Sequence, residues 1–380
     1  MATNKRQLIA LCGLATLFMT AREVLAQASQ GGTDENRLPA IKVSEDGKGF
    51  VVEGTSRPFV PWGFNYLGVF GKLAEEQWHT EEGWQRIERD FRLMKQLGAN
   101  VVRWHLQFPT YMSGPRQANP DQLKRLRKLL VLARQTGLYL DLTGLNLFRK
   151  EAIPAWYDAM SEEERWETQA YFWEVIARTC AGDSAVFCYD LTNEPVVVAA
   201  KEGEHPWVAG ELGGLYFVQR ISHNRQQRPQ SEIAAAWANR LSTAIRQQDK
   251  RTLITVGVIP WSFVWKGAKP VFYTEATRDS LDFVSIHVYP KSGNLANELE
   301  ALKAYDVGKP LVIEEIFPLE CSIQELDQFI DAARPQVSGW ISHFFGYSIE
   351  EHRGGAEPAG PLVAEFLQFW SRKKKDVVPQ

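Results

Sequence analysis

Short apolar runs alternate eight times along this chain with stretches of helical periodicity. The runs are rich in β-branched and large apolar residues, as strands buried on both faces tend to be. They cover residues 59–65, 100–104, 138–142, 186–191, 253–257, 283–289, 311–315 and 339–344. This alternation predicts an α/β fold, a single parallel (β/α)8 TIM barrel, with a doubly wound sheet as the alternative. A barrel takes roughly 250 residues, so the 380-residue chain has room for one.

The segments between the runs contain start and stop signals of helices. Asn119 precedes a proline, and Ser161 and Ser322 are each followed three residues later by a glutamate, the pattern of a capping box. Gly137 stands where a helix end needs a left-handed residue. Residues 196–231 are an extended connection after the fourth strand, on the face where barrel enzymes have their sites. We interpret it as a substrate-shaping loop.

The amino terminus has the order of a secretory signal peptide. Lys5 and Arg6 precede an apolar run over residues 8–19, and small residues follow up to Ala26. The run is shorter than the ~20 residues of a membrane-spanning helix. We therefore expect cleavage near Ala26, a secreted or periplasmic protein, and no stable membrane insertion after the leader is removed.

The remaining chain is predicted to hold one folded domain with short polar ends. Residues 27–45 are polar and glycine-rich and indicate a flexible lead-in. The predicted segments are a signal peptide at 1–26, this lead-in at 27–45, the catalytic barrel domain at 46–372 and a carboxy-terminal tail at 373–380.

Charge and cysteine content restrict the partners of the chain. A net charge of −3 gives no field that would attract nucleic acid. Without the leader, Cys180, Cys188 and Cys321 remain, which we expect to be buried free thiols, with a Cys180–Cys188 bridge as the alternative. Zinc-ligand spacings are absent from the sequence. We expect no metal, no organic cofactor and a monomer.

Polar side chains follow the carboxyl ends of the predicted strands, which converge on one mouth in a barrel. They are Asn65, Arg103, Asn146, Asn193, Glu194, His287, Tyr289 and Glu315. Retaining glycoside hydrolysis needs two carboxylates about 5–5.5 Å apart, one to donate a proton and one to attack. Opposed strands of an eight-stranded barrel can supply Glu194 and Glu315 at that separation.

Two motifs resemble the signatures of glycoside hydrolase family 5, in the clan of retaining eightfold βα-barrel glycosidases. They are Leu-Thr-Asn-Glu-Pro at 191–195 and Val-Ile-Glu-Glu at 312–315. Arg103, His287 and Tyr289 follow in the family's order, and the resemblance covers residues 48–370. It implies an O-glycosyl hydrolase that cleaves a β-linked polysaccharide or oligosaccharide by double displacement, with β-mannan and β-1,4-glucan as leading substrates.

The resemblance assigns the two catalytic roles. Glu194 is similar to the acid/base of the family and would have to be protonated at the start of the reaction. Glu315 is similar to the nucleophile, with the adjacent Glu314 as its rival. In the similar mannanase pattern the second glutamate of the pair attacks, which favours Glu315.

The resemblance also implies the roles of the surrounding residues. Asn193 is similar to the residue that bonds the sugar 2-hydroxyl. Arg103 and Tyr289 would bond the nucleophile and keep it ionised. His287 would lie near the sugar and the acid/base.

The chain departs from the family pattern at strands three and eight. Many relatives end strand three with a histidine, whereas here Asn146 lies in that region and resembles the mannanase-like branch. Strand eight usually ends in a tryptophan beneath the reacting sugar. Here His343 or Phe344 takes that position, and Trp340 comes earlier.

Three tryptophans are candidate platforms for sugar rings, namely Trp62, Trp261 and Trp265. Other functions also remain open. A transglycosylase would use a sugar hydroxyl in place of water, and a catalytically inactive barrel would only bind carbohydrate. A metal-dependent hydrolase is disfavoured by the lack of a His-x-His ligand cluster.

Overall fold

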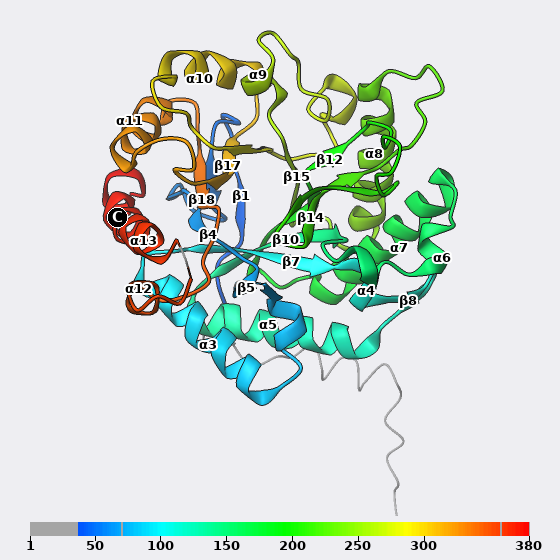
Figure 1. Cartoon of the computed structure of the whole chain (residues 1–380), viewed down its shortest axis with the longest axis horizontal. Coiled ribbons are helices and arrows are strands. Elements are labelled where there is room, and N and C mark those ends of the chain that lie inside the picture. Colours follow the sequence, from blue (N-terminus) through cyan, green and yellow to red (C-terminus); the bar gives the residue numbers. More distant parts are fainter. Residues whose placement is uncertain (1–36, 70, 358, 380) are drawn as a thin grey trace, which may run out of the picture. The chain divides into compact units, whose positions relative to one another are not determined.

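The computed structural model describes residues 37–69, 71–357 and 359–379, and its centre is a closed barrel of eight parallel strands (Figure 1). In barrel order these are β4 (Trp62–Tyr66), β7 (Val101–Gln107), β10 (Tyr139–Asn146), β11 (Val186–Asn193), β15 (Leu253–Val258), β16 (Val284–Val288), β17 (Leu311–Ile316) and β18 (Gly339–Ser342). Each predicted run overlaps one of these strands. The barrel is therefore confirmed, and the doubly wound sheet is wrong because β18 pairs with β4 and closes the sheet.

Helices surround the barrel (Figure 1). The longer ones are α3 (Glu81–Gln96), α5 (Pro120–Thr136), α7 (Glu162–Cys180), α8 (Gln230–Gln248), α10 (Leu295–Leu302), α11 (Ile323–Ala333) and α13 (Gly360–Val377). The predicted caps are confirmed, since Asn119 accepts a hydrogen bond from the Asp121 N–H and both Ser161 and Ser322 form capping boxes. Between β15 and β16 the chain forms only the short helices α9 (Trp261–Val264) and η2 (Glu275–Thr277).

The loop after β11 is extended, as predicted, and has its own small sheet. Its strands are β12 (Pro195–Val196), β13 (Val208–Leu212) and β14 (Leu215–Arg220), in the order β12-β14-β13. The parallel pairing of β12 with β14 anchors this sheet directly behind the end of β11. The loop is therefore an ordered part of the barrel mouth.

Shorter elements connect the main ones. They are the hairpins β5 (Gly68–Val69) with β6 (Lys72–Leu73) and β8 (Met112–Gly114) with β9 (Gln117–Ala118), and the helices α2 (Ala74–Gln77), α4 (Phe108–Tyr111), α6 (Ala155–Asp158), α12 (Ile349–Arg353), η1 (Lys150–Ala152) and η3 (Lys303–Tyr305).

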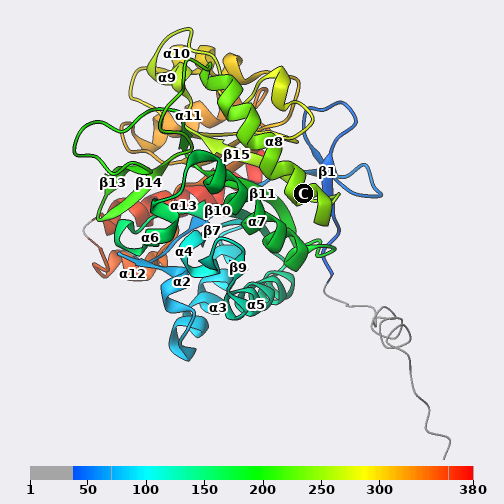
Figure 2. The ribbon, with the colours of Figure 1, turned by 90° about the vertical axis from the view of Figure 1, so that its right-hand side faces the viewer.

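A three-stranded antiparallel sheet covers the amino-terminal end of the barrel. It consists of β1 (Ile41–Val43), β2 (Phe50–Val52) and β3 (Pro58–Phe59). Phe50 packs edge-on against Phe187 and Phe283, with ring centroids 5.2 and 5.3 Å apart. Figure 2 shows β1 on the side of the molecule opposite β13 and β14, so the apolar end and the loop-bearing end are separated.

This sheet corrects the predicted amino-terminal boundary. The lead-in was expected to extend to residue 45, but Ile41 pairs with Val52 and is buried in the apolar cluster at the barrel end. A polar composition around residues 27–40 hid the short strand that follows. The predicted signal peptide and residues 27–36 lie outside the described residues.

The carboxy-terminal boundary also differs from the prediction. Residues 373–377 belong to α13 and not to a tail, because Lys373 forms ion pairs with Asp327 at 2.6 Å and Asp331 at 2.7 Å on α11. Helix α13 also covers Trp62. Trp62 is fully buried and stacks on Trp370 of this helix, with ring centroids 3.9 Å apart. Trp62 is a core residue, and its prediction as a sugar platform is wrong.

Cys180, Cys188 and Cys321 are free thiols; Cys180 and Cys188 are buried, as predicted, whereas Cys321 is half-buried. Among the residues that the structure describes, no helix combines the length and the apolar character needed to cross a membrane.

Candidate active site

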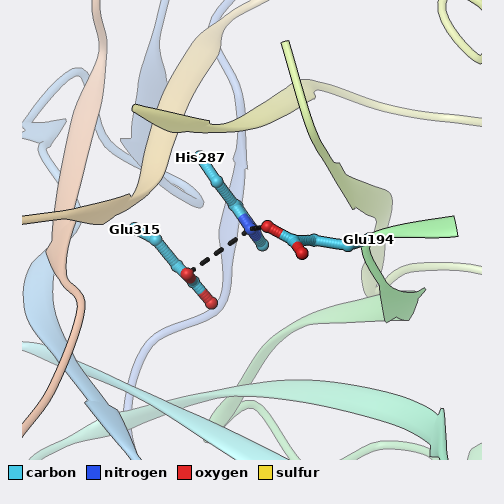
Figure 3. Close-up of side chains that lie close together, drawn as sticks. All are labelled: Glu194, His287 and Glu315. Carbon is cyan, nitrogen blue, oxygen red and sulfur yellow. Dashed lines mark hydrogen bonds and ion pairs between the residues drawn. The ribbon is translucent and has the colours of Figure 1, made fainter. Parts of the chain in front are cut away.

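Glu194 and Glu315 approach each other at the barrel mouth with His287 between them (Figure 3). Glu194 follows β11, His287 lies on β16 and Glu315 lies on β17. The Nδ1 atom of His287 is 2.9 Å from Glu194 Oε1 and 3.5 Å from Glu315 Oε2. A carboxyl oxygen of Glu194 and a carboxyl oxygen of Glu315 lie within 4.8 Å of each other. The structure thus brings the two predicted catalytic residues together.

His287 is a buried cation in this arrangement. Burial alone lowers the pKa of His287, but the charge of Glu315, the hydrogen bond to Glu194 and the nearby Glu314 carboxylate outweigh it and raise the pKa to about 10. Both ring nitrogens therefore have protons at neutral pH. The imidazolium places one positive charge between the two glutamates.

Three side chains hold Glu315. Arg103 Nη1 donates to Oε1 at 2.9 Å, and the Tyr289 hydroxyl donates to Oε2 at 2.5 Å. Tyr289 has only one hydroxyl proton, so we assign His343 Nδ1 as the donor in its contacts with that hydroxyl, at 2.7 Å, and with Oε2, at 3.3 Å.

These contacts fix the charge of Glu315. Burial raises the pKa of Glu315, but the charge of His287, the hydrogen bond and charge of His343 and the charge of Arg103 hold it well below its usual range. Glu315 is therefore a carboxylate. It is also held from two sides, which orients its oxygens toward the mouth of the barrel.

Arg103 connects Glu315 to the barrel interior. Its guanidinium is fully buried and donates to Asn65 at 2.9 Å, Asn193 at 3.0 Å and Asp190 at 2.7 Å. Burial lowers the pKa of Arg103, but the charges of Glu314, Asp190 and Glu315 raise it well above its usual value. One permanently charged side chain on β7 therefore contacts residues of three other strands, β4, β11 and β17.

Glu314, the alternative candidate for the nucleophile, lies below the barrel mouth. Glu314 is fully buried, and its Oε2 atom is 3.4 Å from Arg103 Nε and 3.6 Å from His287 Nε2. Glu315 keeps 8% of its surface exposed. Of the two adjacent glutamates, only Glu315 reaches solvent, which favours it as the one that meets a substrate.

Three further residues of the site escaped the sequence analysis. His105 Nε2 is 3.0 Å from Asn65 Oδ1, and Asp190 and Asp141 are fully buried beside Arg103 and Glu314. Strand alternation could have found His105, since it stands two residues after Arg103 on the same strand. The two aspartates stand inside apolar runs, where a charged residue is a signal of a buried polar cluster.

The backbone at Glu194 is left-handed, with φ of 47°. This conformation is unfavourable for a non-glycine residue and persists only where the surroundings fix it. Here the Glu194 N–H donates to the Gly257 carbonyl at 2.9 Å, and its own carbonyl accepts from the Gln219 N–H at 3.2 Å. The barrel on one side and β14 on the other thus aim Glu194 into the mouth.

Two predicted binding residues lie outside this contact network. Asn146 is fully buried, and its Nδ2 donates to the Thr143 carbonyl of its own strand. The ring of Phe344 lies beside Gly346. His343 and not Phe344 reaches Glu315, which settles the register at the end of β18. Asn193 is in the network, but its amide already bonds Arg103 and the Phe217 carbonyl.

Trp261 and Trp265 form an aromatic pair after β15. Their rings stack with centroids 5.0 Å apart and an interplanar angle of 23°, and Trp265 is 60% exposed. Val264 between them is also exposed. This surface lies after the carboxyl end of a barrel strand, where it can contact a bound chain of sugars.

Two groups of side chains have the spacing of metal ligands. They are Glu194 with His287 and Glu315, and Asp141 with Asp190 and Glu314, each with ligand atoms within 4.8 Å of one another. In the first group His287 Nδ1 lies 2.9 Å from Glu194 and 3.5 Å from Glu315, so the ring bridges the two glutamates. The second group faces the guanidinium of Arg103.

A closed βα barrel with two carboxylates at the ends of its fourth and seventh strands defines a class, that of the barrel glycosidases. The comparison with known families agrees with this geometry. The family model for cellulase (glycosyl hydrolase family 5) matches residues 43–329, and the chain belongs to this family.

Solved structures with the same fold include an enzyme named as a β-1,4-mannosidase and one named as a β-1,4-mannanase. An exo-β-1,4-mannosidase from Opitutaceae bacterium strain TAV5 aligns over 89% of this chain, with a TM-score of 0.64 and 16% identity. This chain spans 64% of that protein's length. A β-1,4-mannanase from the sea hare Aplysia kurodai (88% of this chain, 97% of that one) has a TM-score of 0.58 and 15% identity.

A third example is the catalytic domain of endoglucanase Cel5A from Thermobifida fusca, with a TM-score of 0.54 and 18% identity. The alignment covers 87% of this chain and 97% of that domain. A comparison with curated proteins gives no match.

Gly257 provides the space in which the charged groups meet. A Cβ atom there would lie 2.4 Å from Glu314 Oε2, 2.8 Å from His287 Nε2 and 2.9 Å from Arg103 Nη2. We predict that Gly257→Ala lowers the free energy of unfolding by about 1–3 kcal/mol, because the added methyl overpacks the cluster. Urea unfolding monitored by circular dichroism measures this change.

Gly49→Ala is the matched control, since the nearest atom to its added Cβ is 3.9 Å away. Equal stability of the two variants would contradict the crowding at Gly257.

Proposed function

We propose that this protein is a retaining glycoside hydrolase that cleaves a β-linked glycan through a glycosyl-enzyme intermediate. The observation that carries the proposal is the approach of Glu194 and Glu315, with oxygens within 4.8 Å of one another. Retaining enzymes hold their two carboxyl groups about 5–5.5 Å apart, whereas inverting enzymes leave about 6.5–9.5 Å for a water molecule. The short spacing supports direct attack by one of the glutamates.

In the first half of the reaction Glu315 attacks the anomeric carbon. The bond from that carbon to the leaving sugar oxygen breaks, and the carboxylic acid of Glu194 gives its proton to the departing oxygen. Arg103 and Tyr289 hold the attacking carboxylate in one orientation. Because these donors are fixed before the substrate binds, no reorganisation is needed during attack.

In the second half a water molecule replaces Glu315. The Glu194 carboxylate accepts a proton from the water as the water oxygen bonds the anomeric carbon and the bond to Glu315 breaks. The negative charge thus moves from Glu315 to Glu194 and back during one cycle. His287 contacts both carboxylates, so its positive charge stabilises whichever one is ionised.

The substrate class we propose is β-1,4-linked mannan or glucan. The solved structures that share the fold include enzymes named for each of these polymers, which supports the class. The stacked pair of Trp261 and Trp265 supports a substrate longer than one sugar, because flat aromatic rings pack against the C–H faces of sugar rings.

We further propose that the protein is exported, on the basis of the leader at residues 1–26. The intact mass of the chain recovered from the medium or periplasm of an expressing bacterium should correspond to a start at Gln27. Recovery of the full-length chain from the cytoplasm alone would contradict export.

Replacing the nucleophile tests the proposed function most simply. We predict that Glu315→Ala lowers kcat on mannan or β-1,4-glucan oligosaccharides by several orders of magnitude. Azide should restore turnover of an aryl β-glycoside and give a product of inverted configuration, because the small anion fills the space of the carboxylate. The adjacent Glu314→Ala serves as the comparison. Azide rescue of Glu314→Ala, with none for Glu315→Ala, would reverse the assignment of the two glutamates.

Replacing the proton donor has a different signature. We predict that Glu194→Gln lowers kcat on natural oligosaccharides by about 10²–10⁴-fold, because the leaving oxygen must then depart unprotonated. Aryl glycosides with good leaving groups need no proton and should lose much less in the first half-reaction. The ratio of kcat/KM between variant and wild type on both substrate types measures the contrast, because kcat/KM reports the first half-reaction alone. An equal relative loss on the two types would show that Glu194 is not the proton donor.

A further inference from the structure

A second group of three carboxyl side chains lies below Glu194 and Glu315, the two glutamates at the barrel mouth (the mouth glutamates). Asp141, Asp190 and Glu314 come from three different strands and are all fully buried, with oxygens within 4.8 Å of one another. The described cations in contact with this group are Arg103 and His287. Arg103 also binds Glu315, and His287 also binds Glu194. The group therefore has more carboxyls than the positive charges shared with it can neutralise.

The three carboxyls differ in the donors that they receive. Asp190 accepts from Arg103 Nη2 at 2.7 Å and from the Gly257 N–H at 2.8 Å, one donor on each oxygen. Glu314 has Arg103 Nε at 3.4 Å and His287 Nε2 at 3.6 Å. Both oxygens of Asp141 and both oxygens of Glu314 are buried without a hydrogen-bond partner, so the two groups differ in the cations that lie beside Glu314 and not in their hydrogen bonds.

A buried carboxylate that lacks a donor is unstable, since the charged form loses its hydration and receives nothing in return. Two carboxylates in contact repel each other unless one of them holds a proton. Asp190 has a donor on each oxygen and is stable as a carboxylate. Of the two carboxyls without hydrogen bonds, the proton belongs on Asp141, because the charged form of Glu314 gains from Arg103 and His287 beside it. By this criterion Asp190 is ionised and Asp141 is not.

We propose that Asp141 is a protonated positioning residue that donates its hydrogen to Glu314 and thereby keeps Glu314 ionised against Arg103. Arg103 is then fixed between Glu314, Asp190 and Glu315. This role rests on the proposed function, since it concerns how the nucleophile is held. It also defines a protonation state that is measurable without any substrate.

The pKa directions of Asp141 and Glu314 agree with this geometry, whereas burial and the charge of Glu314 raise the pKa of Asp190 to about 7 in spite of its bonds from Arg103 and the Gly257 N–H. Burial, together with the charge of Glu314, raises the pKa of Asp141 well above its usual range. Burial raises the pKa of Glu314 too, but the charge of Arg103 and the interactions with His287 and Asp141 reverse the direction and lower it to about 2. Other titratable or charged groups that interact with this pair are Asp190, Cys188, Arg103, His105, Tyr273, His287 and Glu315.

Two substitutions at residue 141 separate a neutral donor from a charged group. Asp141→Asn keeps a neutral side chain with N–H donors, whereas Asp141→Ala removes the donor. We expect Asp141→Ala to lower kcat/KM by about tenfold or more and to move the acid limb of its pH profile to higher pH, because Glu314 then takes up the proton itself. Asp141→Asn should restore kcat/KM to within about threefold of wild type, with the wild-type pH profile.

Asp190→Asn is the matched comparison, since it neutralises a carboxyl in the same cluster that we assign as ionised. It should lose activity by more than about tenfold and displace the pH profile, because Arg103 loses a charged partner. The reverse pattern, with Asp190→Asn close to wild type and Asp141→Asn impaired with a displaced profile, would overturn the proposal and place the proton on Asp190.

Infrared difference spectroscopy tests the protonation state independently of activity. The difference between wild type and Asp141→Asn near neutral pH should contain the band of a protonated carboxyl group that the variant lacks. Loss of a carboxylate band instead would overturn the proposal, even in a preparation without hydrolase activity. A stoichiometric metal ion in the purified wild type, lost in Asp141→Asn, would also overturn it, because a cation and not a proton would then neutralise the cluster.

Discussion

The buried guanidinium of Arg103 is the interaction on which the site depends. It is fully enclosed by the barrel and contacts Asp190, Glu314 and Glu315, side chains from two other strands. A buried charge is tolerable only with close partners of opposite sign and well-aligned hydrogen bonds. The three carboxyl side chains provide the opposite charge, Asp190 and Glu315 accept hydrogen bonds from the guanidinium, and Arg103 holds Glu315 in place. Removal of Arg103 or of its carboxylate partners would leave an uncompensated charge in the barrel interior. The strands and the site therefore stabilise each other.

The same electrostatics make the two mouth glutamates unlike each other. Glu315 receives Arg103, Tyr289 and His343, whereas Glu194 has His287 and a backbone held in a left-handed conformation. One carboxyl is surrounded by donors and stays ionised. The other, Glu194, has the His287 ring as its hydrogen-bond partner. This asymmetry, more than the presence of two acids, is what double displacement requires.

The sequence alone predicted the features that depend on local patterns. Alternation located the eight strands, and cap residues such as Ser161 located helix starts. The motifs placed Glu194 and Glu315 at strand ends. The features that the sequence did not predict depend on which face of a strand points inward and on which side chains pack against that face. Trp62 looked like a platform but packs on a helix more than three hundred residues away in the chain. Asp141 and Asp190, on the neighbouring strands β10 and β11, meet Glu314 only because the barrel closes.

The anomeric configuration of the first product tests the central claim most directly. Proton NMR can follow the cleavage of a β-1,4-linked oligosaccharide before mutarotation scrambles the new reducing end. With Glu315 as nucleophile, two displacements at the anomeric carbon should release the β-anomer first. Initial release of the α-anomer would mean a single displacement by water, and would contradict the role assigned to the contact between Glu194 and Glu315.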